Sequence, residues 1–304
     1  MLSGGIDAGG SKFDAQLFDA DMQVIGHRRI AVPGGGFDPF ADALADQARW
    51  LLAQSGQADM PIGIGLPGIV DPVTGTTTAS NIPASGRNIS TALRHRLGRD
   101  VVFGTDAVAF ALSEAQGGAG DGFRNVIGLV IGTGVGAAQV LDGTVPHRAN
   151  AMAVEIGHVG TSGRVLAAHG LPQSRCGCGR LGCVETWVAG PGLTRLAAHV
   201  LGTPIAPPDL AAHAQGDTVL AIWAELAAEA LDTLHLLLDP DCIVLGGGLS
   251  LLPDVLQRLS RALASRRLGP VRLPELRLAR FGDASGGRGM ALMARARCLG
   301  SPSG

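Results

Sequence analysis

The chain has 304 residues, a length typical of two domains, and its 24 basic and 26 acidic side chains give a formal net charge of −2 at pH 7. This balance excludes the broad basic surface of a nucleic-acid-binding protein, and 46 % hydrophobic against 16 % charged residues excludes intrinsic disorder. The sequence shows neither a signal-peptide pattern nor an apolar run of membrane-spanning length. We therefore expect a cytoplasmic protein that binds neither nucleic acid nor membrane.

The first third of the chain predicts a sheet with helices. Residues 1–30 predict a hairpin: residues 5–18 alternate around a glycine-rich bend, and residues 19–22 turn the chain into a second strand that runs to residue 30. Apolar residues at helical spacing predict a helix over 39–54, and a buried-type strand over 61–66 ends at Pro67 and Gly68. The predicted order is strand, strand, helix, strand, and it continues with a helix over 91–97, a strand over 101–104 and a helix over 107–116.

The rest of the chain repeats this organisation. A polar, glycine-rich break at 117–122 is the predicted domain boundary, and a second hairpin follows over 125–131 and 137–141. Both halves therefore begin with a glycine-rich hairpin. The later predicted elements are a helix over 217–238, a strand over 242–245, a helix over 252–267, a strand near 276–279 and a helix that opens at 290–296.

Three glycine-rich turns follow predicted strands and are candidates for binding a nucleotide. Adjacent glycines let the backbone present N–H groups to a polyphosphate, and the carboxylate before the first turn suits a hydrated Mg²⁺ ion. An ordinary glycine-containing hairpin is the alternative for each turn taken alone. The candidates are Asp7, Gly9, Gly10, Ser11 and Lys12 in the first turn, Gly132, Thr133 and Gly134 in the second, and Gly246, Gly247 and Gly248 in the third.

Asp106 lies between a predicted strand and a predicted helix, a position with two interpretations. A carboxylate there can cap the helix N-terminus. It can also act as a general base that accepts a proton from a hydroxyl group while the hydroxyl oxygen attacks phosphorus.

His158, Cys176, Cys178 and Cys183 form the most specific pattern in the sequence. Three thiolates and one imidazole satisfy a tetrahedral Zn²⁺ ion, and four protein ligands close the site, so the zinc would be structural. Glu155 and Glu185 lie next to these ligands, and the metal loop would bring both carboxylates and the imidazole to one patch suited to sugar hydroxyls. Solvated surface glutamates are the alternative.

With these residues in place, the chain resembles the sugar kinases of the ROK family (repressor, open reading frame, kinase), within the actin-like ATPase superfamily. The resemblance covers essentially the whole chain. It is carried by residues 7–12, 65–68, 105–107, 132–136 and 239–250 and by the cysteine and histidine signature.

The resemblance implies an α/β protein with the actin-like ATPase (ribonuclease H-like) fold, two α/β domains around a cleft and a structural zinc loop. The domains would be 1–117 and 118–287, with a C-terminal helix over 288–304 packing back on the first. It further implies a homodimer that binds ATP with Mg²⁺ and a sugar. Asp106 would deprotonate the sugar 6-hydroxyl, and the sugar would be held by Gly68, Asn81, Thr105, Glu155, His158 and Glu185.

Within the family, residues 81–86, 110–114 and 280–289 are most similar to the bacterial N-acetyl-D-glucosamine kinases. This likeness implies transfer of phosphate from ATP to N-acetyl-D-glucosamine. The alternatives are a glucokinase, another hexose or amino-sugar kinase, or a sugar-binding sensor with weak catalysis. Two departures from the family pattern are Thr105, where asparagine is usual, and Val154, where a small residue is usual.

Overall fold

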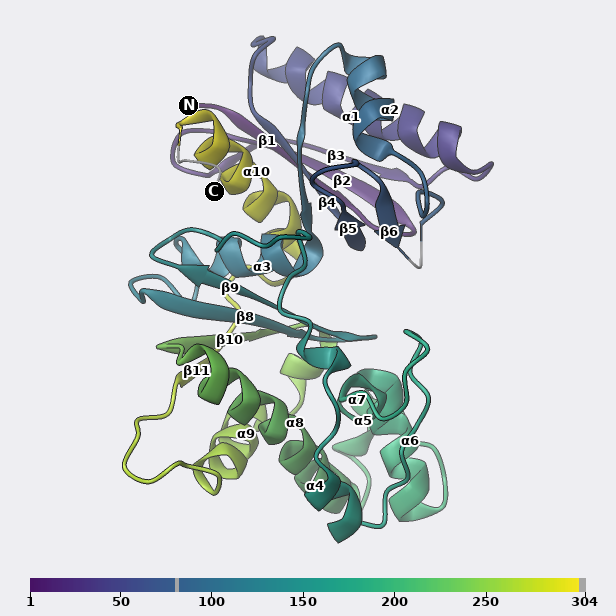
Figure 1. Cartoon of the computed structure of the whole chain (residues 1–304), viewed down its shortest axis with the longest axis vertical. Helices are drawn as coiled ribbons and strands as arrows, with labels where there is room; N and C mark the ends of the chain where they lie inside the picture. The colour runs from purple at the N-terminus through teal and green to yellow at the C-terminus, as the bar shows by residue number, and fades with distance from the viewer. Residues whose placement is uncertain (80–81, 301–304) are drawn as a thin grey trace. The chain divides into compact units, whose positions relative to one another are not determined.

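The computed structural model describes residues 1–79 and 82–300 (Figure 1). The chain divides into two compact units: unit 1 contains residues 1–116, 143–153 and the chain from 281 onward, and unit 2 contains 117–142 and 154–280. The sequence-based division differs in three places: it assigns Gly117 to the first domain, it leaves 143–153 in the second domain, and it starts the returning segment at 288. The loop at 143–153 has no periodic pattern that would indicate which core it joins, whereas in the structure Gln116 Nε2 donates to Gly143 O at 2.8 Å.

Unit 1 contains a five-stranded mixed sheet with the strand order β3-β2-β1-β4-β7. β1 pairs antiparallel with β2, and β4 and β7 extend the sheet in parallel from the other side of β1. A separate two-stranded sheet joins β5 to β6. The strands are β1 (Ser3–Ala8), β2 (Lys12–Phe18), β3 (Val24–Ala31), β4 (Ile62–Leu66), β5 (Gly68–Val70), β6 (Thr77–Ala79) and β7 (Val102–Thr105).

Two predictions for this region are wrong in detail. Three strands, not two, precede the first helix, because Gly9 N donates to Lys12 O at 3.1 Å and closes a tight turn that divides the alternating segment. The second error is at Gly68, which begins β5 instead of only ending a strand. Strands of three residues are too short for alternation to be recognised in the sequence.

Helices cover both faces of the unit 1 sheet (Figure 1). α1 (Phe37–Ser55) and α2 (Ile89–Leu97) lie on one face, where the rings of Phe13 and Phe40 meet edge to face at 5.0 Å. α10 (Ser285–Cys298) lies on the other face and also packs on α3 (Asp106–Ala115). α10 begins five residues before the predicted start, because the glycines in its first turns lower the helix propensity that the sequence displays.

Close packing of backbones holds α10 in unit 1. A Cβ atom on Gly5 would lie 1.8 Å from Gly287 O, and one on Gly289 would lie 1.8 Å from Ala109 O. The buried carboxylate of Glu114 accepts hydrogen bonds from Phe281 N at 2.9 Å and Ser285 Oγ at 3.1 Å. The glycines are therefore required by the packing of this helix.

Unit 2 contains a four-stranded mixed sheet with the order β11-β10-β8-β9. As in unit 1, an antiparallel hairpin, β8 with β9, leads a sheet that continues in parallel through β10 and β11. The apolar core includes Trp187 and Trp223, whose indole N–H groups donate to Pro172 O and Val188 O. The strands are β8 (Asn125–Ile131), β9 (Val135–Leu141), β10 (Cys242–Gly246) and β11 (Glu275–Leu278).

Most helices of unit 2 between β9 and β10 were not predicted. Three of them have six residues or fewer, too few for helical periodicity to be recognised, whereas a fourth, Gly190–Leu201, has helically spaced apolar residues that the sequence analysis missed. The two longer predicted helices are present, although the second spans fewer residues than expected. The helices are α4 (Gly163–Ala168), α5 (Glu185–Val188), α6 (Gly190–Leu201), α7 (Pro207–Leu210), α8 (Gly216–Leu238) and α9 (Val255–Ala264), with 3-10 turns at Ile156–His158 and Gly248–Leu251.

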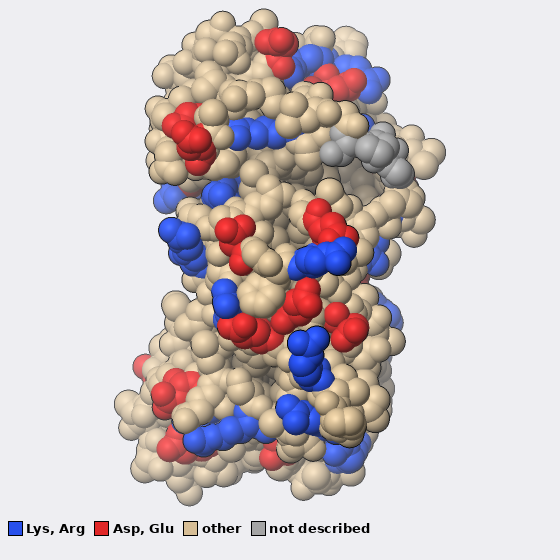
Figure 2. Space-filling model, turned by 90° about the vertical axis from the view of Figure 1, so that its left-hand side faces the viewer, with Lys and Arg blue, Asp and Glu red and all other residues tan. Residues whose placement is uncertain are grey.

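Charged side chains of both signs are interspersed on the face that Figure 2 shows. Among the described residues, exposed ion pairs include Arg94 with Asp100 and Arg124 with Asp142. Solvent screens such pairs, so they contribute little and the two apolar cores dominate the stability. In the described part of the chain, none of the helices combines the length and the apolar character needed to span a membrane.

Candidate functional site

In unit 1, predicted site residues lie at one edge of the sheet. β1, β4 and β7 run parallel, so their carboxyl ends meet at the same edge, the usual location of ligand sites in open α/β sheets. Asp7 lies near the end of β1, and Gly68 follows β4. Thr105 ends β7, and Asp106 begins α3. Asn81 falls outside the described residues.

The first glycine turn connects β1 to β2 at this edge. Gly10, Ser11 and Lys12 are exposed, and Ser11 O accepts a hydrogen bond from Val32 N at 3.0 Å. The hydroxyl of Ser11 and the ammonium of Lys12 are therefore accessible to an anionic ligand. Asp7 is half-buried next to this turn.

Thr105, and not Asp106, caps the helix that follows β7. Thr105 Oγ1 accepts a hydrogen bond from Val108 N at 3.2 Å, and its backbone has the extended conformation typical of an N-cap residue. Asp106 is the first residue of α3 and accepts from Ala107 N at 2.8 Å. Its carboxylate is thus not the helix cap, which removes the main structural explanation for an aspartate at this position.

The surroundings of Asp106 change its acidity. Desolvation raises the pKa of its carboxyl above the ordinary value, and hydrogen bonds from Ala107 N and its own N–H oppose this shift. Asp106 nevertheless remains exposed at the start of α3. A reachable carboxylate with raised proton affinity is chemically suited to accept a proton.

In unit 2, the second and third glycine turns lie side by side. β8 and β10 are parallel neighbours, and their carboxyl ends lead into Gly132 and Gly247 respectively. A Cβ atom on Gly132 would contact Gly248 N at 4.0 Å, and one on Gly247, which has φ +81°, would lie 2.5 Å from Ile131 O. Only glycine fits this close approach, so unit 2 brings Gly132, Thr133 and Gly134 together with Gly246, Gly247 and Gly248.

Glu185 adjoins these turns across a small cavity. Its Oε2 lies 3.3 Å from the position of a Cβ atom on Gly134, and a cavity of about 140 Å³ is lined by Glu185, Thr133 and Cys176 among others. Arg175 and Arg195 also line this cavity, and the sequence analysis missed both. Arg175 directly precedes Cys176, which is the only signal that could have identified it, and α6, which carries Arg195, was not predicted.

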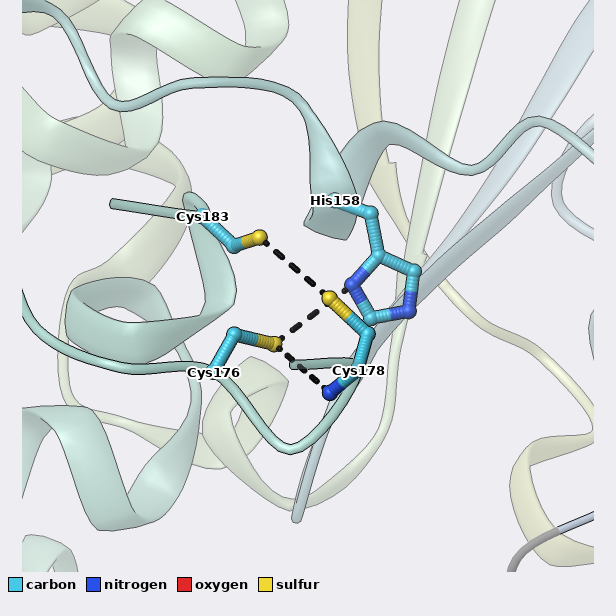
Figure 3. Close-up of side chains that lie close together, drawn as sticks. All are labelled: His158, Cys176, Cys178 and Cys183. Atoms are coloured by element: carbon cyan, nitrogen blue, oxygen red, sulfur yellow. Dashed lines mark hydrogen bonds between the residues drawn. The ribbon is translucent and has the colours of Figure 1, made fainter. Parts of the chain in front are cut away.

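The predicted zinc ligands form a cluster in unit 2 (Figure 3). Each of the four residues offers one ligand atom, and these four atoms lie within 4.8 Å of one another; the residues are His158, Cys176, Cys178 and Cys183. Cys178 Sγ lies 3.6 Å from Cys183 Sγ, and Cys176 Sγ lies 3.7 Å from His158 Nδ1. All five cysteines of the chain are free thiols.

These distances are compatible with a tetrahedral zinc ion. With Zn–S near 2.3 Å and Zn–N near 2.0 Å, neighbouring ligand atoms lie about 3.5–3.8 Å apart. The longest separation in the cluster is larger by about 1 Å, which a small side-chain rotation corrects. The donor set of three sulfurs and one imidazole nitrogen is that of a structural zinc site, in which the ion would tie His158 to the cysteine loop.

The loop that carries the cysteines folds back on itself through backbone hydrogen bonds. Gly179 N donates to Cys176 O at 3.0 Å and Gly182 N donates to Ser174 O at 2.8 Å, with φ values of +89° and +79°. The glycines supply conformations that side chains disfavour. This requirement explains why glycines alternate with the cysteines in this loop.

The thiols of the cluster differ in acidity. Burial and a hydrogen bond to Glu185 raise the pKa of Cys176 to about 12, and hydrogen bonds from Arg180 lower the pKa of Cys178 to about 6. The Cys176 thiol donates to Glu185 Oε1 at 2.8 Å, and the same oxygen lies 3.6 Å from His158 Nδ1. Glu185 therefore belongs to the immediate surroundings of the cluster.

His158 ends a 3-10 turn that Glu155 precedes. Nδ1 of His158 faces the sulfurs and Nε2 points away from them (Figure 3), so the ring leaves one nitrogen for a second partner. Glu155 precedes this turn and is partly exposed. Val154 exchanges two backbone hydrogen bonds with Ala137 and packs on the core of unit 2, which accommodates the larger side chain.

Comparisons with known proteins show which family the whole chain resembles. The ROK family model matches residues 3–297. An N-acetylgalactosamine kinase of Shewanella sp. (strain ANA-3) is 38 % identical over 95 % of each chain, and an N-acetyl-D-glucosamine kinase of Pectobacterium atrosepticum is 35 % identical over 95 % of this chain and 97 % of its own. A ROK family glucokinase from Streptomyces griseus, solved with glucose and AMPPNP, is 27 % identical over 97 % of this chain and 99 % of its own, with a TM-score of 0.75.

Proposed function

Because the chain belongs to the ROK family, we propose that it is a sugar kinase that uses Mg²⁺ and ATP to phosphorylate the 6-hydroxyl of an N-acetylhexosamine, namely N-acetyl-D-glucosamine. The observation that carries the proposal is that Thr105 caps α3, which leaves the Asp106 carboxylate available for chemistry. The location of Asp7, Gly68 and Asp106 at the carboxyl ends of parallel strands also supports it.

In the proposed reaction, Asp106 accepts the proton of the sugar 6-hydroxyl. The sugar oxygen forms a bond to the γ-phosphorus of ATP, the bond from that phosphorus to the bridging oxygen of ADP breaks, and the proton moves to the Asp106 carboxylate. The raised pKa of Asp106 favours this transfer, because a base with greater proton affinity is a better acceptor.

The remaining residues bind and orient the two substrates. Glu155, His158 and Glu185 are proposed to bind other hydroxyls of the sugar ring, and Thr105 and the main chain at Gly68 to bind the sugar near Asp106. Asp7 and the exposed turn 9–12 are proposed to bind the Mg²⁺ and phosphates, together with the paired glycine turns of unit 2. When bound, Mg²⁺ would be held next to Asp7 and would supply positive charge that offsets the negative charge developing on the phosphates.

Zinc in the cysteine and histidine cluster would have a structural role in this proposal. His158 would bind it through Nδ1 and keep Nε2 for the sugar, so the metal would fix the direction of the imidazole. A homodimer in the cytoplasm is part of the same proposal and rests on the resemblance to the family.

The test is release of ADP, followed by a coupled assay, in the presence of Mg²⁺ and ATP. The panel of acceptors contains N-acetylglucosamine, N-acetylgalactosamine, N-acetylmannosamine, glucose, mannose and fructose, with Asp106→Asn as the inactive control. Turnover that is fastest with N-acetylglucosamine is expected. A glucokinase would prefer glucose, and a sensor would be stabilised against heat by a sugar without releasing ADP, so either result would overturn the proposal.

A further inference from the structure

We propose that Gly286 is a positioning residue for Asp7: because it has no side chain, the first turn of α10 fixes the place of the carboxylate assigned to Mg²⁺ and ATP. The inference rests on the proposed function, which gives Asp7 that role. Gly286 itself is not proposed to contact either substrate.

The strand β1 presents two neighbouring positions to α10. Side chains two residues apart on a strand point to the same face of the sheet, so Gly5 and Asp7 share a face. At Gly5 the helix backbone approaches so closely that a Cβ atom would lie 1.8 Å from Gly287 O. The helix therefore lies directly on β1, and the Asp7 side chain must fit beside its first turn.

Gly286 provides the space for that side chain. A Cβ atom at Gly286 would lie 2.7 Å from Asp7 Cγ, 2.8 Å from Oδ2 and 3.0 Å from Cβ. Ordinary contact begins near 3.4 Å, so the carboxyl carbon would have to retreat by about 0.7 Å. Because Asp7 Cβ itself would lie only 3.0 Å from the added carbon, and rotation about χ1 does not move Cβ, such a rotation does not remove the whole conflict.

Electrostatic attraction also favours the position of the Asp7 carboxylate beside the first turn of α10. The N-terminus of a helix carries a partial positive charge that attracts a carboxylate, and α10 is a 14-residue helix whose second residue is Gly286. Shape and charge thus act together on Asp7. A displacement of several tenths of an ångström at a metal-binding carboxylate is large, since a misplacement of about 1 Å can reduce catalysis on the order of 100-fold.

The experiment compares Gly286→Ala with Gly163→Ala in the full chain. Gly163 begins α4, and no atom outside its own turn lies within 4 Å of its Cβ position, so it controls for an added methyl group near a helix start. Binding of AMPPNP with Mg²⁺ and binding of sugar are measured by calorimetry. We expect Gly286→Ala to weaken AMPPNP binding at least about tenfold and to leave sugar binding unchanged, and Gly163→Ala to change neither.

Asp7→Ala supplies the test of mechanism. If Gly286 acts through Asp7, adding Gly286→Ala to the Asp7→Ala variant weakens AMPPNP binding no further. Gly286→Ala also lowers the melting temperature less in the Asp7→Ala background than in the wild type, because the conflicting carboxylate is gone. Equal loss of melting temperature in both backgrounds would overturn the inference, and so would wild-type AMPPNP affinity in Gly286→Ala. The melting comparison works even if the single variant folds poorly.

The outcome also separates this inference from the proposed function. A wild-type chain that binds no AMPPNP in the presence of Mg²⁺ would overturn the proposed function, and the inference with it. A wild-type chain that binds AMPPNP, together with an unaffected Gly286→Ala variant, would overturn the inference alone.

Discussion

Substitutions at Thr105 and Asp106 should separate stability from catalysis at neighbouring positions. Thr105 accepts the hydrogen bond of a buried N–H group at the start of α3, whereas Asp106 contributes only a contact to the adjacent backbone N–H. Thr105→Ala is therefore expected to lower stability, and Asp106→Asn to lower activity.

The magnitude for Thr105 follows from its capping role. Loss of an N-cap side chain costs about 0.5–2 kcal/mol, and for a unit of this size about 1 kcal/mol lowers the melting temperature by roughly 2–4 °C. Thr105→Ser keeps a hydroxyl group in the same place and serves as the matched control. Thermal unfolding followed by circular dichroism measures both variants.

The expected effect on stability has the opposite sign for Asp106→Asn. Its pKa is raised in the folded protein, so the folded state binds its proton more tightly than the unfolded state, and ionisation costs stability as the pH rises above the unfolded value of about 3.9. Asp106→Asn removes this cost, so its melting temperature at pH 7 should equal or exceed that of the wild type. Turnover should fall roughly 10²–10⁴-fold, as expected on loss of a positioned base.

The assay for Asp106 is ADP release at saturating sugar, measured across pH. The acid limb of the wild-type profile should lie above pH 3.8, because the raised pKa keeps the base protonated to higher pH. An Asp106→Asn variant that unfolds at lower temperature but turns over normally would show that Asp106 is the structural residue. That result would refute both the capping assignment and the base assignment.

Three other outcomes follow from the geometry. Metal analysis should find one zinc per chain, which is lost in Cys178→Ser because Cys178 belongs to the cluster. Cys298→Ser is the control and should retain the zinc, since Cys298 is an exposed thiol on α10. Full metal content in Cys178→Ser would contradict the zinc assignment. Gly289→Ala should lower the melting temperature relative to Gly163→Ala, because the Cβ atom at position 289 would lie 1.8 Å from Ala109 O and overpacking costs about 1–3 kcal/mol. Equal melting temperatures of the two variants would count against the packing of α10 on α3. Glu185→Gln should weaken sugar binding about 10- to 100-fold in calorimetry, the loss expected for a charged hydrogen bond, and unchanged affinity would remove Glu185 from the sugar site.

Local chemistry made much of this protein predictable from its sequence. The cysteine and histidine signature requires particular ligand types at short spacing, and the structure brings all four side chains together. Long elements such as α1 and α8 carry enough periodicity to be recognised. The glycine-rich bends within residues 5–18 and 125–141 were visible because alternation and turn residues occur together in a short stretch.

Only the tertiary structure shows the surroundings of residues that contact segments far away in the sequence. The sequence left two interpretations for Asp106, and the hydrogen bond from Val108 N to Thr105 Oγ1 excludes the helix-cap interpretation, so that the general base remains as the proposed role. The start of α10 was hidden because Gly286, Gly287 and Gly289 weaken helix propensity locally, while the sheet and α3 require them for close packing. Arg195 lines the same cavity as Glu185, which only the packing of α6 within unit 2 reveals. Contacts between residues far apart in the chain depend on how surfaces pack, and composition and spacing do not encode that information locally.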